Sequence, residues 1–132
     1  MTEKEIDTFE KVQAQLKGMY DEISILSKKS QNDGLSLFKL KFINKILIDY
    51  NNVLLEDYKP FDDFEIFDEN AIPTNSDVVM ILTQYLNCFE KLRSDNITSK
   101  EDYNGNKYET KWFWKIKDKI SKYETGKPEK IK

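Results

Sequence analysis

Residues 97–125 read ITSKEDYNGNKYETKWFWKIKDKISKYET, and the fold class of the chain depends on the structure that this stretch adopts. Its second half offers a helical face, because four large residues recur at steps of three or four: Trp112, Ile116, Ile120 and Tyr123. The same stretch also alternates as a strand does, with every second position on one side: Tyr108, Thr110, Trp112, Trp114 and Ile116. Asn104-Gly105, just upstream, is the strongest short-range signal for a β-hairpin.

A hairpin needs a partner strand upstream, and the candidate segment is SKEDY at 99–103. This segment is polar and charged, and Asp, Glu and Lys are depleted in strands. We therefore predict a helix that begins near Thr110. A short hairpin near 103–116 is kept as the alternative.

The N-terminal segment has the clearest pattern in the chain. Apolar residues of 3–29 follow helical steps and form one stripe: Ile6, Phe9, Val12, Leu16, Met19, Ile23 and Leu26. Thr2 and Glu5 match a capping box, in which a hydroxyl and a carboxylate each accept a hydrogen bond from a free N–H group of the first turn. This segment is predicted to be a long amphipathic helix.

Two further segments show the same periodicity. Residues 35–58 are apolar over most of a helical circumference, which is typical of a central, buried helix. Residues 74–96 begin with polar side chains that favour helix N-caps, followed by a second apolar stripe. Together with the helix near the C-terminus, these segments predict an all-α, single-domain bundle of about four helices. The predicted domain covers 1–126, and 127–132 are predicted to be a frayed basic tail.

The composition excludes several kinds of catalytic site. The chain has 132 residues, no histidine and a single cysteine, Cys88. Nucleophilic triads that use His, and zinc sites built from Cys and His, therefore cannot form within one chain. The four glycines belong to no phosphate-binding loop. We predict that the protein is not an enzyme and holds no cofactor and no metal ion.

The sequence also bears on location. The longest apolar runs are short, such as VVMIL at 78–82, far below the ~20 residues that cross a bilayer. The N-terminus is acidic and lacks a basic segment followed by an apolar one, so it does not resemble a secretory signal. A single cysteine permits no internal disulfide, which is typical of a reducing compartment. We predict a cytoplasmic protein without a membrane partner.

Residues 57–73, DYKPFDDFEIFDENAIP, combine aromatic and acidic side chains between two predicted helices. The rings recur at every third position: Tyr58, Phe61, Phe64 and Phe67. Carboxylates lie among them: Asp62, Asp63, Glu65, Asp68 and Glu69. The rings can anchor this connector to the core while the carboxylates form an acidic surface, which could imitate a nucleic-acid backbone. The stretch lacks the glycine that an EF-hand loop requires, so no metal ion is predicted there.

Charge is uneven along the chain. Residues 1–99 have a net charge of −7 and residues 100–132 one of +4, which sum to the −3 of the whole chain. In the basic part, lysines alternate with aromatic residues: Lys107, Lys111, Lys115, Lys117, Lys119 and Lys122. Lysines can neutralise phosphates while rings stack on bases, so nucleic-acid binding is an alternative function. The single arginine, Arg93, argues against sequence-specific reading of DNA.

The aromatic residues exceed what the core of a small bundle needs, and Tyr103 and Tyr108 add to this excess. Aromatic side chains are enriched in protein interfaces. We therefore predict a protein–protein interaction module, a small accessory or regulatory subunit that buries aromatic anchors on a partner while flanking charges steer its approach. The predicted anchors are Tyr58, Phe61, Phe64, Phe67, Trp112 and Trp114. Trp114 is expected to be exposed, and self-association is left open.

Overall fold

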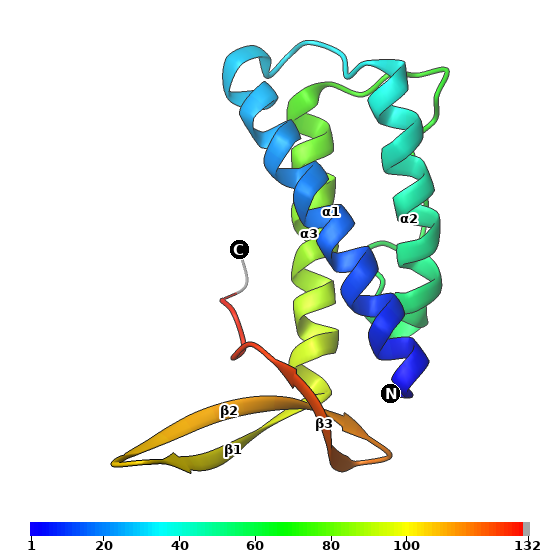
Figure 1. Cartoon of the computed structure of the whole chain (residues 1–132). Helices are drawn as coiled ribbons and strands as arrows, with labels where there is room; N and C mark the ends of the chain where they lie inside the picture. The colour runs from blue at the N-terminus through cyan, green and yellow to red at the C-terminus, as the bar shows by residue number, and fades with distance from the viewer. Residues whose placement is uncertain (131–132) are drawn as a thin grey trace.

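The computed structural model describes residues 1–130, apart from the side chains of residues 55 and 56, and shows three long helices followed by a three-stranded sheet (Figure 1). The helices are α1 (Glu3–Ser30), α2 (Leu37–Tyr58) and α3 (Asn75–Asp95). The strands are β1 (Ile97–Asn104), β2 (Lys107–Ile116) and β3 (Lys119–Thr125). The three helices predicted upstream of residue 97 are confirmed. The prediction of an all-α bundle is wrong, because the chain is α+β.

The predicted C-terminal helix is replaced by an antiparallel meander in the order β1-β2-β3. Asn104 pairs with Lys107, so the first turn consists of Gly105 and Asn106, with Gly105 at a positive φ of 69°. Glycine at this first central position is typical of the type II′ hairpin turn. The alternative of a hairpin near 103–116 identified β2 but placed the turn one residue too early, at Asn104-Gly105, and underestimated the extent of the sheet.

The second turn, between β2 and β3, has a different backbone geometry. Its central residues, Lys117 and Asp118, both have positive φ angles, of 53° and 61°. Two consecutive positive φ angles define the type I′ turn, whose twist matches that of the flanking strands. Lysine is uncommon in this conformation, so the sequence carried no clear signal for the second hairpin.

Side-chain caps fix the starts of the helices. Thr2 and Glu5 form the predicted capping box, with N···O distances of 3.2 and 3.3 Å. Ser36 and Thr74 cap α2 and α3 by accepting the backbone N–H three residues on. A capping side chain therefore fixes where each helix begins.

An aromatic stack joins the sheet to all three helices. Phe9 of α1 and Phe89 of α3 stack at 3.9 Å between ring centroids, and Tyr50 of α2 stacks on Phe89 at 3.8 Å. Trp114 of β2 meets Phe9 edge to face at 4.9 Å. All four rings are fully buried, so one continuous core runs from the helices into the sheet.

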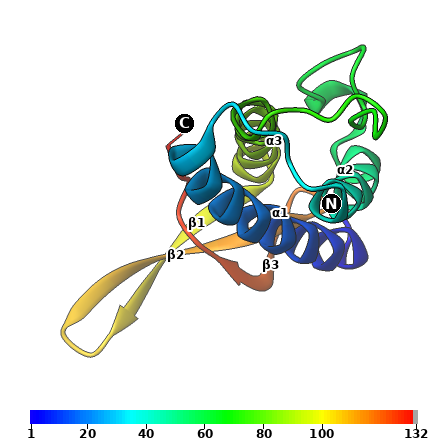
Figure 2. The ribbon, with the colours of Figure 1, turned by 90° about the horizontal axis from the view of Figure 1, so that it is seen from above.

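The sheet lies across the end of the helices where α3 finishes and α1 begins (Figure 1). Only Asn96 separates α3 from β1, so the last turn of the helix leads directly into the strand. The distal part of the β1–β2 hairpin extends beyond the helices in both views (Figures 1 and 2). We call residues 99–111 the arm.

After β3 the chain runs back along α3, where Arg93 holds it. The guanidinium makes two hydrogen bonds to the Glu90 carboxylate, at 2.8 and 2.9 Å. Its remaining donors reach the Thr125 hydroxyl at 3.0 Å and the carbonyls of Gly126 and Lys127 at 2.7 and 2.8 Å. All five N–H groups of the side chain are thus used. Residues 131–132 of the predicted tail lie outside the described residues, and the domain boundary at 126 stays a prediction.

Candidate interaction surfaces

The aromatic side chains of the connector between α2 and α3 turn towards the helices. Phe67 is buried, and Phe64 packs against it with centroids 5.1 Å apart and against Tyr85 of α3 at 6.3 Å. Phe61 and Tyr58 are half-buried, and the Tyr58 hydroxyl donates to Asp95 at 2.9 Å. The interpretation of these rings as anchors of the connector is confirmed. Little of their surface is left for a partner.

Two buried asparagines on α2 hold the backbone of the connector, and sequence reasoning missed both. The Asn44 side chain donates to the carbonyl of Phe67 and accepts its N–H, each at 2.9 Å. Asn51 donates to the carbonyl of Glu65 and accepts the Tyr85 hydroxyl, also at 2.9 Å. Two asparagines seven residues apart within an apolar helix were the available signal, since a buried amide needs partners.

Replacing Asn44 with alanine is expected to destabilise the protein by about 1–3 kcal/mol, because two buried backbone groups of Phe67 lose their partners. Urea denaturation followed by circular dichroism measures this loss. Asn52→Ala is the control, since Asn52 is exposed on the same helix, and its effect should stay within about 0.5 kcal/mol. Equal stabilities of the two variants would contradict the role assigned to Asn44.

The five predicted carboxylates all lie at the surface of the connector: Asp62, Asp63, Glu65, Asp68 and Glu69. Glu65 lies 3.9 Å from the Lys59 ammonium, and Asp68 accepts the N–H of Asn70 at 2.9 Å. Within residues 1–130, no group of three or more His, Cys, Asp or Glu side chains is arranged to hold a metal ion. The acidic surface therefore exists as a geometric feature, with the rings beneath it.

The two tryptophans lie at the root of the sheet, where Trp114 is buried and Trp112 is partly exposed. Trp114 is 0% exposed and its indole N–H donates to Glu10 of α1 at 3.0 Å. The expectation that Trp114 is an exposed anchor is wrong, because the β1–β2 register pairs it with the buried Ile97. Trp112 is half-buried against the same core.

The exposed aromatic residues of the sheet are at the far end of the arm. Tyr103 and Tyr108 pair directly across β1 and β2, with ring centroids 4.9 Å apart. They are 60% and 75% exposed, respectively. They lie on the same face of the ribbon as Trp112 and Trp114, because side chains alternate along a strand. This face therefore has tryptophans near the core and tyrosines at the tip, with Glu101 and Thr110 between them.

Charge on the arm is balanced. Three lysines, at 100, 107 and 111, stand beside three carboxylates, at 101, 102 and 109. The Lys111 ammonium lies 3.1 Å from Asp102, and this hydrogen bond raises the pKa of Lys111. On the opposite face of the ribbon, the Thr110 hydroxyl donates to the Glu101 carboxylate at 2.8 Å. The arm thus has aromatic tips and no excess of positive charge.

The six lysines of the predicted nucleic-acid site are spread along the sheet. Lys107 and Lys111 belong to the arm, whereas Lys117 and Lys119 lie at the turn at the opposite end of β2. Lys115 lies close to the same turn, opposite Ile120, and Lys122 lies further along β3. This separation removes the close spacing that their positions in the sequence suggested.

The single cysteine, Cys88, is half-buried on α3, and burial raises the pKa of its thiol. No helix among the described residues is both long and apolar enough to cross a membrane. The chain matches no family model, and comparison with curated proteins and with solved structures finds no match. Its function therefore has to be inferred from its own surfaces.

Proposed function

We propose that the protein is a non-enzymatic protein-binding module that contacts a protein partner through the arm. The observation that carries this proposal is the pair Tyr103 and Tyr108, exposed side by side at the end of a projecting hairpin. Tyrosine is enriched at the centres of protein interfaces, where its ring is buried and its hydroxyl keeps a polar partner. The sequence-based choice of anchors is thereby replaced by residues that a partner can reach.

The free edge of β1 supports the same proposal. β1 is the first strand of the sheet, and β2 pairs with only one of its edges. An extended segment of a partner can add to such an edge by backbone hydrogen bonds, while adjacent side chains supply specificity. Cross-strand contacts on both faces join β1 to β2 within the arm: the Lys111–Asp102 ion pair and the hydrogen bond from Thr110 to Glu101.

Balanced charge favours a protein over a nucleic acid as the partner. Binding to phosphates draws on a concentrated set of cations, and the arm carries equal numbers of lysines and carboxylates. A cytoplasmic location is part of the proposal and rests on the single cysteine.

Loss of both arm tyrosines is expected to abolish partner recovery from the cells that produce the protein. The tagged full chain, its Tyr103→Ala/Tyr108→Ala variant and a control would be purified side by side and the co-purified proteins quantified by mass spectrometry. The control, Met80→Ala/Ile120→Ala, removes two exposed apolar side chains away from the arm. A protein recovered with the wild type and the control should fall at least about tenfold with the arm variant, a loss of about 1.4 kcal/mol or more.

Nuclease treatment before purification should leave this recovery unchanged. Recovery that disappears with nuclease would instead support nucleic-acid binding. Equal recovery by the arm variant and the control would contradict the role of the arm.

A further inference from the structure

Grooves run between each pair of the three helices, and segments of the chain cover two of them. The connector lies over α2 and α3, held by Asn44 and Asn51. The C-terminal segment lies over α1 and α3, where the Glu129 N–H donates to Glu90 at 2.9 Å and its carboxylate lies 3.8 Å from the Lys17 ammonium. Between α1 and α2, by contrast, the described residues leave an open groove.

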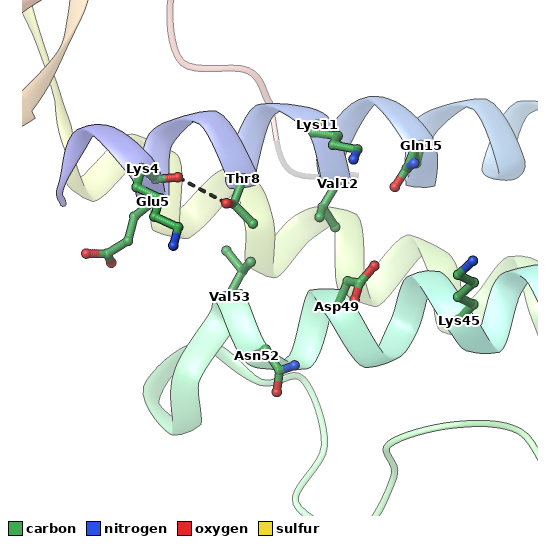
Figure 3. A pocket seen from close by; sticks show the side chains of 10 residues that line it. All are labelled: Lys4, Glu5, Thr8, Lys11, Val12, Gln15, Lys45, Asp49, Asn52 and Val53. Carbon is green, nitrogen blue, oxygen red and sulfur yellow. Dashed lines mark hydrogen bonds between the residues drawn. The ribbon is translucent and has the colours of Figure 1, made fainter.

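This groove contains a hollow of about 620 Å³. Val12 of α1 and Val53 of α2 point into it from opposite helices and give it an apolar floor (Figure 3). Lys45 and Asp49 of α2 point into the same space from one wall, and Lys11 approaches from the other (Figure 3). The hollow thus offers an apolar strip between charged rims.

Positive charge predominates at these rims. Lys4 and Lys11 of α1 and Lys45 of α2 line the groove, and none of the three forms an ion pair among the described residues. Two carboxylates, Glu5 and Asp49, also lie in the walls, and Glu5 accepts the Thr2 N–H of the capping box. Three ammonium groups and two carboxylates leave the walls with a net charge of +1, which favours an acidic occupant.

The apolar character of the groove continues along α2 towards its N-terminus. Phe38 and Phe42 share a helical face with Lys45 and Asp49, because the four positions are three or four residues apart. These two rings are 73% and 48% exposed and meet edge to face at 5.0 Å. From Phe38 to Asn52 the wall is about 21 Å long, which corresponds to about four turns of a helix.

We infer that the α1/α2 groove binds an acidic amphipathic helix of a partner protein, which completes a four-helix arrangement. The apolar stripe of that helix packs on Val12, Val53 and Phe42, and its carboxylates pair with Lys4, Lys11 and Lys45. Helix-in-groove recognition requires such an apolar stripe, with contacts at every third or fourth residue. This surface is separate from the arm, so the two can fail or succeed independently.

The test uses two designed peptides of about 15 residues, long enough to span the groove. Both carry leucines at helical spacing, and the remaining positions are mainly glutamate in one and lysine in the other. The acidic peptide should shift amide resonances of α1 and α2 that border the hollow in NMR spectra of the full chain. The lysine peptide should not. Lys11→Glu/Lys45→Glu should weaken binding of the acidic peptide at least about tenfold.

Lys28→Glu/Lys29→Glu is the matched control, because it changes the net charge equally at the exposed C-terminal end of α1. It should leave the affinity within about twofold of the wild type, a difference of about 0.4 kcal/mol. An equal loss in both variants, shifts centred outside α1 and α2, or no binding up to about 1 mM would overturn the inference. So would sedimentation that shows a dimer from which the acidic peptide releases monomers, because the groove would then be occupied by a second copy.

Discussion

The Trp114→Ala variant is expected to lose about 3–5 kcal/mol of unfolding free energy, the range for removing a fully buried aromatic side chain. Trp114 is 0% exposed and meets Phe9 at the end of the aromatic stack. Its indole N–H also donates to Glu10, so the variant leaves a cavity and removes a link between β2 and α1. A loss of this size is a large part of the 5–15 kcal/mol that typical domains possess.

Urea denaturation monitored by circular dichroism at 222 nm measures this loss. Trp114→Phe should be less destabilising, because it keeps most of the packing and removes only the bond to Glu10 and part of the ring. Tyr108→Ala is the matched control on the same strand, and its exposed ring should contribute no more than about 0.5 kcal/mol. A loss below about 1 kcal/mol for Trp114→Ala would show that the sheet does not dock on the helices through this residue.

The second large effect is expected for Arg93→Met, which should cost about 3–5 kcal/mol by leaving the Glu90 carboxylate buried without its partner. Both side chains are less than 10% exposed, at 6% and 8%, and their bidentate contact is 2.8–2.9 Å long. The variant also removes the donors that hold the carbonyls of Gly126 and Lys127. We therefore expect faster amide hydrogen exchange over residues 125–129.

Replacing both members of the pair distinguishes an ion pair from a packing effect. Glu90→Leu/Arg93→Met should be more stable than Arg93→Met alone, because no buried charge remains unpaired. Lys91→Ala is the control for the same helix, since its pair with Asp95 is exposed and worth less than about 1 kcal/mol. If Arg93→Met lost no more unfolding free energy than Lys91→Ala, the Arg93 guanidinium would not hold the C-terminal segment as its contacts indicate.

The helices could be predicted because their signals are local. Two of these signals are a capping residue such as Thr2 and an apolar stripe at helical spacing. Both act within one segment, so they do not depend on the rest of the chain. The sheet could not be predicted in this way, because a strand is stabilised by pairing with a second segment, which the pattern of one segment does not reveal. SKEDY, poor strand material on its own, forms most of the edge strand β1 because β2 supplies its hydrogen bonds, and Trp114 docks the root of β2 on the helices.

The predicted site residues show the same contrast between local signals, which could be interpreted, and long-range contacts, which could not. Rings at every third position predicted that the connector is anchored, which Phe64 and Phe67 confirm. The same aromatic excess led to Trp114 as an exposed anchor, since its exposure depended on a helical rather than an extended backbone. Asn44 and Asn51 were missed because an asparagine in a helix becomes informative only when its burial is known.

The most direct measurement of the central claim is photo-crosslinking from the tip of the arm. Tyr108 would be replaced by the photo-reactive p-benzoylphenylalanine in the cells that produce the protein, since the exposed position leaves room for its second ring. Ile120 on β3 would be replaced by the same residue as the control. We predict that irradiation joins position 108 to one defined protein and gives no such product at position 120. No crosslinked protein at position 108, or the same products at both positions, would contradict the proposal that the arm is the surface that binds the partner.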